Sequence, residues 1–494
     1  GMLVASIERC PVRGGKVKSF DATAARAVKG VKQVVQVSSG VAVVAESFWP
    51  ALQGRRALKV EWDEGPLAQV SSAMIDTEYE RLGKQPGQVA RNDGDAERAL
   101  AAGGRVHEAV YQVPYLEHAC MEPMNAVAHV TRDACIIWAP TQAPGPSQAI
   151  AARTTGLPPE KITVHTMLMG GGFGRRNEVD FVQDAVEVAK VVGAPVKVMW
   201  TREDDMTNGF YRPATYNVLR GALGADGAPT AWFTRVVGPG LLTQRGRGKP
   251  GQVDPTAMSA MRDLPYDIPN LRIEWTNKDF GIPVGFWRSV GSSQNGFIVE
   301  SFVDEMAHLA GKDPFEYRRA LLGKSPRHKA ILELVTARAN WGAPLPAGQG
   351  RGIAVVFSYG SYAATCAEVS VAADGTVRVP RIVCGIDAGL AVNPEQVKAQ
   401  MEGGAVYALS ATLYGQITFA KGRVQQTNFH TYPLLRINEM PKVEVHILDS
   451  GEAPGGLGEP GVPSVAPAVC NAIFVATGKR IRRLPIDKDQ LKRA

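Results

Sequence analysis

A run of four glycines and one phenylalanine, Gly170–Gly174, constrains the fold of this chain more than any other stretch. The alternating segment "KITVHTML" before it predicts a strand, and the apolar spacing of "EVDFVQDAVEVAKVVG" after it predicts a helix. A chain gives up neighbouring side chains only where its backbone bends sharply or where something approaches it closely. Because a helix begins just beyond the run, its backbone N–H groups and its dipole favour an anionic group there.

The glycine run matches neither of the common phosphate-binding signatures. No Gly-Lys-Ser/Thr follows it, as a Walker loop requires. A dinucleotide fingerprint starting at Gly172 needs Gly or Ala at position 177, where Asn177 stands. A glycine-rich turn without a ligand is one interpretation. The functional hypothesis is a backbone cradle for a bulky anionic group, with Phe173 beside it.

With 494 residues the sequence is too long for a single core, and its pattern divides it into parts. Short β-rich runs and a predicted helix at 21–30 indicate a small α+β domain at the start, and the turn-rich segment 84–104 predicts a linker. Strand, loop and helix then alternate up to a boundary at 341–352. The last part returns to strands and ends in a helix closed by Gly478. We therefore predict an α+β fold in three parts, residues 1–85, 105–342 and 350–490.

Charge, hydropathy and cysteine spacing exclude several classes of protein. The net charge of +7 is spread along the chain without a basic stripe interleaved with aromatic residues, so no nucleic-acid partner is expected. No apolar run approaches the ~20 residues that cross a bilayer, so no transmembrane segment is predicted. The six cysteines include no CxxC pair, which argues against an iron–sulfur cluster or structural zinc in this chain.

Three other segments offer candidate catalytic side chains. "GGLGEPG" presents Glu459 in a stiff turn, where a carboxylate can act as a general base; an exposed turn glutamate is the alternative. "PVGFWRSVG" places Arg288 between an aromatic residue and a small-residue turn, where it can clamp charge; a structural ion pair is the alternative. Gln142 lies in the proline-rich turn "WAPTQAPGP", where its amide can donate a hydrogen bond.

The segment "YLEHACMEPMNAVAHV" contains His118, Cys120, Glu122 and His129. Their spacing fits no zinc template, and a structural histidine is the favoured interpretation.

The order of these segments along the chain is more specific than any one of them. "EPMNAVA", "APTQ", "GGGFGRR", "GFWRSVG" and "GGLGEPG" together resemble the molybdenum-binding large subunit of the xanthine dehydrogenase/aldehyde oxidoreductase family. The resemblance covers nearly the whole chain and is strongest to the branch formed by isoquinoline 1-oxidoreductase beta subunits. It implies a small hammerhead-like α+β domain followed by two larger mixed α/β molybdopterin-binding domains, with the molybdenum site at their junction. Members of this branch commonly carry more than a hundred further residues upstream, so we expect a chain shortened at its N-terminus.

The resemblance also implies which residues bind and react. Molybdopterin, often as its cytosine dinucleotide, holds molybdenum through its own dithiolene, so no side-chain metal ligand is expected. Glu459 matches the catalytic general base, Arg288 stabilises charge on a substrate heteroatom, and Gln142 hydrogen-bonds an oxo ligand or approaches the pterin. No iron–sulfur cluster or FAD is expected in this chain. The positions implied for the cofactor are Gly171, Gly172, Phe173, Gly174, Arg175, Gln142, Gly403, Gly404 and Gly458.

The implied activity is that of a molybdenum hydroxylase, an oxidoreductase that inserts a water-derived oxygen into an electrophilic C–H of an N-heteroaromatic or aldehyde substrate. Electrons pass to a separate small [2Fe–2S] subunit, and a cytochrome c is a candidate acceptor. Purine oxidation is disfavoured, because nothing marks Glu178 as the second glutamate of the purine-oxidising relatives. A cofactor-free fragment or non-catalytic scaffold subunit is the main alternative, and Asn177 disfavours a nucleotide-dependent Rossmann enzyme. By resemblance the location is periplasmic or at the inner membrane, with the cytoplasm as the alternative.

Overall fold

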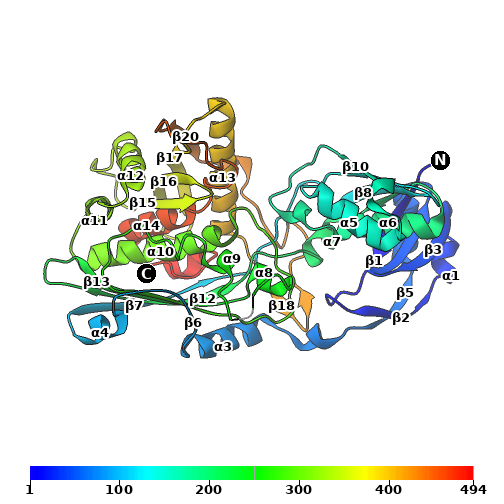
Figure 1. Cartoon of the computed structure of the whole chain (residues 1–494), viewed down its shortest axis with the longest axis horizontal. Coiled ribbons are helices and arrows are strands. Elements are labelled where there is room, and N and C mark those ends of the chain that lie inside the picture. The colour runs from blue at the N-terminus through cyan, green and yellow to red at the C-terminus, as the bar shows by residue number, and fades with distance from the viewer. Residues whose placement is uncertain (250, 493–494) are drawn as a thin grey trace.

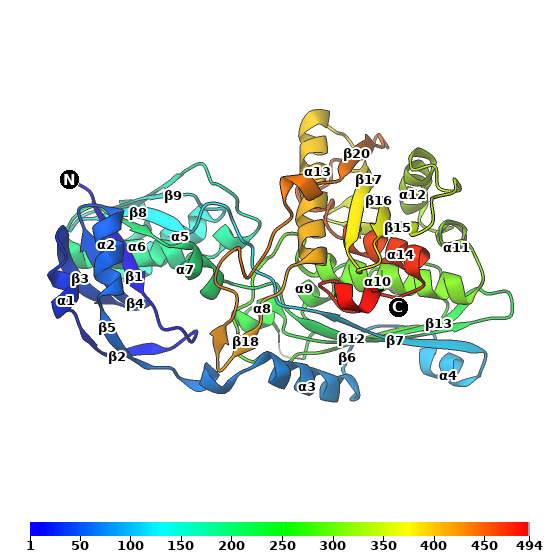
Figure 2. The same cartoon turned by 180° about the vertical axis from the view of Figure 1, so that it is seen from behind.

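The computed structural model describes residues 1–249 and 251–492, which form two lobes joined by several crossing segments (Figure 1). Most of the first lobe comes from residues 1–63 and 125–207, and most of the second from residues 72–113 and 215–491. The chain therefore passes between the lobes several times. The view from behind in Figure 2 shows the same division, with the N-terminus in the first lobe and the C-terminus in the second.

A seven-stranded sheet with strand order β10-β9-β8-β11-β1-β4-β3 is the framework of the first lobe. Helices α5 and α6 cover one face, while α2 and the short α1 cover the other. Strand β1 runs parallel to β11, and β9 runs parallel to β10. The strands are β1 (Leu3–Glu8), β3 (Val31–Val37), β4 (Gly40–Ala45), β8 (Asn125–Val130), β9 (Cys135–Ala139), β10 (Ile162–Thr166) and β11 (Val196–Met199). The helices are α1 (Thr23–Arg26), α2 (Phe48–Arg56), α5 (Pro144–Thr155), α6 (Asp180–Val192) and α7 (Arg202–Thr207).

The predicted strand, glycine run and helix around the glycine-rich segment are confirmed. Strand β10 ends before the run, and α6 follows it with an apolar face that includes Phe181, Val182 and Val186 buried against the sheet. Gly193 ends α6 in the left-handed conformation, with φ of 69°, which a residue without Cβ adopts at little cost. The local sequence pattern thus predicted the correct secondary structure on both sides of the glycine run.

The first strands of the chain do not form a sheet of their own. Strands β1, β3 and β4 pair into the same sheet as residues 125–199, with β1 between β11 and β4. The helix predicted at 21–30 is only four residues long, Thr23–Arg26. The assignment of residues 1–85 to a hammerhead-like domain stays a prediction.

The linker predicted at 84–104 is wrong. This segment contributes edge strand β6 (Gln88–Asp93) to a sheet of the second lobe, and helix α4 (Ala96–Ala101) packs on the same sheet. Its glycines and polar residues suggested a flexible connection. The strand forms because β14, nearly 180 residues further on, supplies the pairing partner.

The second lobe is layered, with helices between two sheets (Figures 1 and 2). A five-stranded sheet of order β6-β14-β13-β12-β7 and a four-stranded sheet of order β15-β16-β17-β20 enclose α10 and α14. Helices α3 and α4 pack on the first sheet, and α12 packs on the second. The strands not yet given are β7 (Arg105–Val113), β12 (Thr215–Leu223), β13 (Pro229–Val237), β14 (Leu271–Thr276), β15 (Gln349–Ser358), β16 (Ser361–Val371), β17 (Val377–Asp387) and β20 (Lys442–Ile447). The helices are α3 (Ser72–Gly83), α8 (Leu241–Gln244), α9 (Pro255–Met258), α10 (Val290–Leu309), α11 (Pro314–Leu321), α12 (Pro326–Arg338), α13 (Pro394–Leu413) and α14 (Val465–Thr477).

Two small ribbons complete the fold. They are β2 (Lys16–Asp21) with β5 (Lys59–Asp63), and β18 (Phe419–Ala420) with β19 (Arg423–Val424). The mixed α and β architecture predicted from the sequence is confirmed.

Helix α10 is buried along almost its whole length, including its charged residues. Glu300 illustrates how the burial is tolerated: it accepts hydrogen bonds from Arg318 Nε at 2.9 Å, Tyr266 Oη at 2.5 Å and the Val355 N–H at 3.0 Å. A buried carboxylate with a full set of donors avoids the large cost of an unpaired charge. The helix thereby ties the two sheets of the second lobe together.

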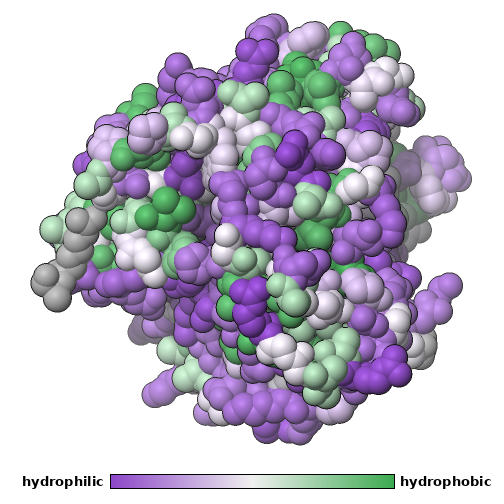
Figure 3. Space-filling model, turned by 90° about the vertical axis from the view of Figure 1, so that its left-hand side faces the viewer, coloured by the Kyte–Doolittle hydropathy of each residue, from purple (hydrophilic) through white to green (hydrophobic). Residues whose placement is uncertain are grey.

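The end of the second lobe that faces the viewer in Figure 3 carries hydrophobic side chains in small groups separated by hydrophilic ones.

Within residues 1–249 and 251–492, no helix combines the length and the apolar character needed to span a bilayer.

Candidate functional site

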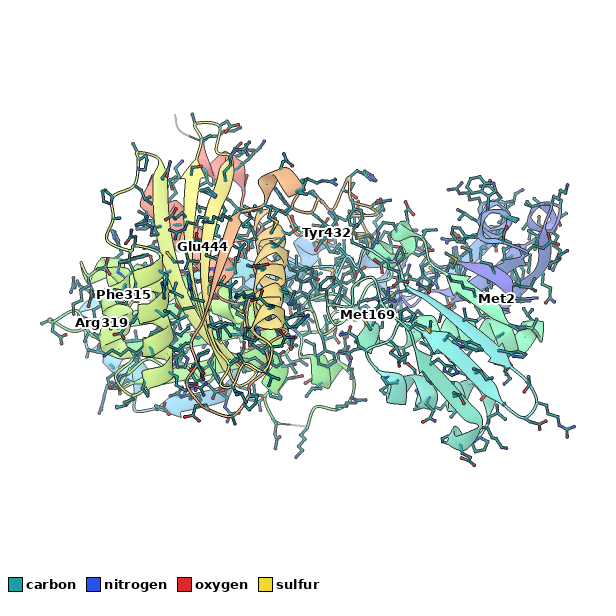
Figure 4. The ribbon with its side chains drawn as sticks, turned by 90° about the horizontal axis from the view of Figure 1, so that it is seen from above. Met2, Met169, Phe315, Arg319, Tyr432 and Glu444 are labelled. Carbon is teal, nitrogen blue, oxygen red and sulfur yellow. The ribbon has the colours of Figure 1, made fainter. Side chains whose placement is uncertain are left out.

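The predicted site residues gather where the two lobes meet. In Figure 4, Met169 at the start of the glycine run and Tyr432 lie between the lobes, whereas Met2 and Phe315 lie towards opposite ends of the molecule. Residues 167–170 are exposed, and the rest of the run turns inward. The glycine loop, defined as residues 167–174, therefore faces the second lobe.

Gly174 is required by geometry, and Gly172 is closely packed against a side chain. Gly174 has φ of +100°, and a Cβ there would stand 1.5 Å from the Phe286 carbonyl oxygen of the second lobe. Gly172 lies against Gln142, and its Cβ would stand 2.6 Å from Gln142 Oε1. The loop lacks side chains at these positions because other parts of the chain approach its backbone.

Gln142 lies beside the glycine loop, as the sequence predicts. Its Oε1 accepts a hydrogen bond from the Gly174 N–H at 3.2 Å, and its backbone N–H donates to the Arg176 carbonyl at 3.0 Å. The side chain as a whole is exposed. Because Oε1 is engaged by the loop, Nε2 is the end of the amide available to donate to a bound group.

Arg175 and Arg176 follow the loop and are both fully buried. Arg175 forms a bidentate pair with Asp180 on α6, at 2.9 and 2.8 Å. Arg176 donates to the Gly171 carbonyl at 2.8 Å and to Glu122 Oε2 at 2.9 Å. These contacts hold the loop against its own lobe, and contact of Arg175 with a cofactor stays a prediction.

Three aromatic rings connect the loop to the second lobe. Phe173, whose φ is +51°, stacks on Tyr407 with ring centroids 4.5 Å apart and an interplanar angle of 15°. Tyr407 stacks in turn on Trp287, at 4.7 Å and 24°. Tyr407 belongs to α13 and Trp287 precedes Arg288, so the stack aligns the glycine loop with the segment that carries the predicted charge clamp.

Arg288 and Glu459, 171 positions apart in sequence, are brought into one hydrogen-bonded group. Arg288 Nε donates to the Gly458 carbonyl at 2.7 Å, and its Nη2 donates to Gln400 Oε1 at 3.0 Å. The Ser289 N–H donates to Glu459 Oε1 at 2.9 Å, and Ser289 Oγ donates to the Glu459 carbonyl at 2.6 Å. Burial lowers the pKa of the Arg288 guanidinium, while the nearby Tyr407 and Glu459 act in the opposite direction. The carboxylate is half-buried, oriented by a backbone donor and close to a buried cation.

The glycines predicted on α13 and before Glu459 divide into two kinds. A Cβ on Gly404 would stand 3.1 Å from Gly461, so this glycine lets α13 pack against the chain after Glu459. A Cβ on Gly403 would meet only Arg288 Nη1, at 3.8 Å, and one on Gly458 only Gln400 Oε1, at 4.0 Å. Both of these glycines are exposed. Packing within the described chain does not require them, so they leave the backbone open to a bound group.

Residues 117–122 support the glycine loop from below and are called its floor; their role was not predicted. Residues 117–122 reach the loop through Cys120 Sγ, which donates to the Gly172 carbonyl at 3.4 Å, and through Glu122 Oε2, which accepts from the Gly170 N–H at 2.8 Å. Tyr407 Oη donates to the His118 carbonyl at 2.8 Å. The sequence did show this cluster of polar residues, but no metal or hydrolase template fits it. Only the tertiary contacts reveal its supporting role.

Glu178, considered above as a second glutamate, is half-buried and forms an ion pair with Arg245. Arg245 lies over the Phe286 ring at 4.7 Å from its centroid.

Glu117 and His118 of this floor segment form a fully buried group of titratable side chains with Asp205 of α7. Burial raises the pKa of Glu117 to about 7, with Arg175 acting against it. Burial and the neighbouring Glu117 raise the pKa of Asp205 to about 7. Burial and Arg175 lower the pKa of His118 to about 3. Near neutral pH the histidine is therefore uncharged and the two carboxyls share a partly protonated state.

We expect Glu117→Gln to reduce the loss of stability that the wild-type protein suffers as pH rises. A carboxyl with a raised folded-state pKa stabilises the fold fully below its unfolded value of 4.5 and loses that contribution as pH rises through about 7. The glutamine removes this term and relieves Asp205. The difference between the two proteins should therefore grow in favour of the variant between pH 5 and 8, by roughly 1–3 kcal/mol. Denaturant unfolding at several pH values measures it.

Glu122→Gln is the matched control for that comparison. Burial favours a higher pKa for Glu122, but hydrogen bonds from Gly170 and Asn125 and the charge of Arg176 hold its pKa below the ordinary value. Its contribution is present above its unfolded pKa and is lost as pH falls, so the sign is opposite. Equal pH dependence of wild type and Glu117→Gln would contradict the assignment.

The residues present fit a large anionic cofactor with its own metal-binding group. The loop and Gly403 with Gly458 offer open backbone on both lobes, Gln142 offers an amide donor, and Arg288 offers a buried positive charge. Among the described residues, no group of three or more His, Cys, Asp or Glu side chains is arranged to hold a metal ion. All six cysteines are buried and unpaired with one another. The absence of side-chain metal ligands from the site stays a prediction.

Comparison with known proteins agrees with this geometry. Residues 82–322 match one family model of a molybdopterin cofactor-binding domain, and residues 325–441 match a second. The chain is 32% identical to the isoquinoline 1-oxidoreductase beta subunit of Brevundimonas diminuta, over 98% of the chain and 64% of that protein. It is also 32% identical to a membrane-bound aldehyde dehydrogenase [pyrroloquinoline-quinone] of Gluconacetobacter polyoxogenes, over 98% of the chain and 68% of that protein. A nicotinate dehydrogenase chain of Pseudomonas putida is 31% identical over 97% of the chain and 42% of that protein.

Both family-model matches are to molybdopterin cofactor-binding domains, so the class is that of molybdopterin-binding proteins. The chain belongs to the xanthine dehydrogenase/aldehyde oxidoreductase family of molybdopterin-dependent oxidoreductases. It spans about two thirds or less of the length of the relatives named above.

Solved structures share the fold at low sequence identity. Quinoline 2-oxidoreductase from Pseudomonas putida 86 superposes with a TM-score of 0.80 at 16% identity, over 99% of this chain and 94% of that one. Aldehyde oxidoreductase from Desulfovibrio gigas gives the same TM-score and identity over 99% of this chain and 77% of that one. The two-lobed arrangement is therefore that of known oxidoreductases.

Proposed function

We propose that this chain is the catalytic part of a molybdenum hydroxylase subunit that oxidises an N-heteroaromatic or aldehyde substrate. The observation that carries the proposal is the joint placement of Glu459 and Arg288 opposite the glycine loop. The substrate classes rest on two relatives, one named for isoquinoline and one for an aldehyde. Both classes of substrate have an electrophilic carbon that a water-derived oxygen can attack.

The overall reaction converts a C–H bond and one water into a C–OH bond, two protons and two electrons. Molybdopterin, when bound, supplies the two-electron redox chemistry and passes the electrons on, as cofactors do in such enzymes. Glu459 accepts the proton of the attacking oxygen. The Ser289 N–H holds the carboxylate in place at 2.9 Å while it does so.

Arg288 has a separate role in this proposal. It is only 8% exposed, and its Nε and Nη2 are held by Gly458 and Gln400. Its positive charge therefore stays fixed beside the base, where it stabilises negative charge that develops on the substrate heteroatom. Gln142 Nε2 donates to the cofactor from the opposite lobe. Gly171, Gly403 and Gly458 let the cofactor approach the backbone.

We propose that the cofactor is the cytosine dinucleotide form and that electrons leave through a separate [2Fe–2S] subunit to a further acceptor such as a cytochrome c. The isoquinoline-oxidising relative is named as a beta subunit, which supports assembly with a second chain. The name of the membrane-bound relative supports a location at or outside the inner membrane, which cell fractionation tests.

Molybdenum and nucleotide analysis of the purified chain tests the proposed function. Near-stoichiometric molybdenum with CMP released on acid hydrolysis is the expected result, followed by turnover of quinolines or aromatic aldehydes with an artificial electron acceptor. Folded protein that contains molybdenum but releases no CMP rejects the dinucleotide form. Folded protein without molybdenum, even when produced with its partner chain, favours the scaffold alternative.

A further inference from the structure

The chain itself uses most of the hydrogen-bond donors of Arg288. A guanidinium has five N–H groups, one on Nε and two on each terminal nitrogen. Nε donates to the Gly458 carbonyl at 2.7 Å. Nη2 donates to two oxygens of Gln400, the backbone carbonyl at 3.2 Å and the side-chain Oε1 at 3.0 Å. Within the part of the chain that the structure describes, the two N–H groups that are left without an acceptor are those of Nη1.

The free nitrogen lies beside an open stretch of helix α13. A Cβ placed on Gly403 would have Nη1 at 3.8 Å and no other group outside its own stretch of helix within 4 Å. Gly403 is exposed, so an atom of a bound molecule can reach Nη1 across this glycine. The rest of the arginine is buried, with only 8% of the residue exposed. Arg288 therefore meets a bound molecule through one nitrogen.

This geometry limits what the arginine can recognise. A carboxylate is bound most strongly by two parallel N–H···O bonds, from Nη1 with Nη2 or from Nε with Nη2. Both arrangements need a hydrogen of Nη2, and both hydrogens of Nη2 are engaged by Gln400. A single acceptor atom, such as a ring nitrogen or an aldehyde oxygen, needs only Nη1. The free donor therefore suits one acceptor atom and not a carboxylate.

The charge balance favours the same class of ligand. The Ser289 N–H holds the carboxylate of Glu459 at 2.9 Å, and the charge of this carboxylate acts on Arg288. The two opposite charges offset each other, so a ligand that brings a further negative charge gains little attraction and is repelled by Glu459. An uncharged acceptor atom avoids this repulsion. Negative charge that develops on that atom during the reaction is then stabilised by Nη1.

We propose that Gln400 is a specificity-determining residue: by engaging Nη2 it makes Arg288 a single-nitrogen donor, which selects substrates with one uncharged acceptor atom over substrates that present a carboxylate. This inference rests on the proposed function, because it requires Arg288 to face the substrate. Gln400 contacts the arginine rather than the reacting atoms, so it acts through the position of the guanidinium. The backbone carbonyl of residue 400 stays in every variant, so a substitution there frees one hydrogen of Nη2.

The engagement of Nη2 is tested on the chain without cofactor, by limited reaction with phenylglyoxal and mass spectrometry of the peptide that contains Arg288. The reagent closes a ring on two guanidinium nitrogens, so a hydrogen-bonded Nη2 slows the reaction. Gln400→Met keeps the length of the side chain but removes its strong acceptor, and we expect Arg288 to react about tenfold faster. Gln400→Glu keeps an acceptor oxygen and should react no faster than wild type. Equal rates in wild type and Gln400→Met overturn the proposal.

Gln396→Met is the matched control for this reaction. Gln396 lies one turn earlier on α13 and is also exposed. The substitution makes the same chemical change on the same helix without touching the arginine. The reaction rate of Arg288 should therefore equal that of wild type. An increase as large as in Gln400→Met would mean that loosening of the helix, and not the lost acceptor, exposes the guanidinium, and it would reject the proposal.

Selectivity is tested on the cofactor-loaded enzyme with benzaldehyde and quinoline, each compared with its carboxylated isomers. We expect wild type to have at least about a tenfold higher kcat/KM for the uncharged parent than for its best carboxylated isomer. Gln400→Met should reduce this ratio by about tenfold, chiefly through a lower KM for the carboxylate. Gln400→Glu should preserve the ratio. A wild-type preference for the carboxylated isomers contradicts the proposal.

The two tests separate this inference from the proposed function. An enzyme that contains full molybdenum but turns over none of these probes rejects the proposed function and, with it, the selectivity. The phenylglyoxal rates still show in that case whether Gln400 engages Nη2. Turnover with the same selectivity in wild type and Gln400→Met leaves the proposed function intact and rejects the role of Gln400.

Discussion

Glu459→Gln should lower kcat of the cofactor-loaded enzyme by about 10²–10⁴. The amide cannot accept the proton that the carboxylate takes, yet its oxygen can still accept the Ser289 N–H that now holds Oε1 at 2.9 Å. The fold and the cofactor content should therefore be unchanged. Steady-state turnover at saturating substrate, together with molybdenum analysis of the same sample, measures both quantities.

Glu452→Gln is the matched control for that substitution. Glu452 lies seven positions upstream on the same connection and is exposed, so its change should leave turnover within about twofold, as surface substitutions usually do. A Glu459→Gln enzyme within tenfold of wild type, with full cofactor, would show that another group acts as the base.

Gly174→Ala should prevent the glycine loop from closing on the second lobe. Its Cβ would overlap the Phe286 carbonyl oxygen, only 1.5 Å away, and φ of +100° is unfavourable for any residue with a side chain. The carbonyl is backbone and cannot rotate aside, so the two lobes must separate locally. We expect a loss of stability of about 3 kcal/mol or more and the loss of most bound molybdenum. Denaturant unfolding and metal analysis measure the two effects.

Gly156→Ala separates the two causes of that effect. Gly156 also has positive φ, +81°, but its Cβ would have no neighbour within 4 Å. This control should show only the cost of the backbone conformation, about 1 kcal/mol, with cofactor content unchanged. Equal effects of the two substitutions would mean that the contact with Phe286 is unimportant.

Local patterns explain which parts of the fold could be predicted. The strand, glycine loop and α6 lie within about 30 consecutive residues, and their periodicity reports directly on their structure. The pairing of β1 with β11 joins Leu3 to Val196, and no local pattern encodes such a partner. The same reason accounts for the missed strand β6, which is stable only because β14 lies beside it.

The candidate site shows the same division. Glu459, Arg288 and Gln142 were predicted as site residues because each stands in a distinctive turn and the family resemblance links them; their roles stay predictions. The pairing of Arg175 with Asp180, which buries the arginine, could not be read from the sequence, and its predicted contact with a cofactor stays a prediction. The role of Tyr407 left no signal in the sequence, because it depends on stacking with Phe173, which lies far away along the chain.

The amino-acid sequence by itself determined the strand, loop and helix around the glycine run and the family, and it singled out the side chains proposed to react. Tertiary structure alone decided that Arg288 lies against Gly458. It also decided that the rings of Phe173, Tyr407 and Trp287 stack across the lobes. Finally, it placed the carboxyl groups of Glu117 and Asp205 close enough to interact in the buried interior. The physical reason is range. Helical hydrogen bonds and side-chain periodicity involve residues only a few positions apart, so a local stretch of sequence encodes them. Packing and long-range hydrogen bonds join segments that are distant in the sequence, and these tertiary contacts decide which side chains of the candidate site meet.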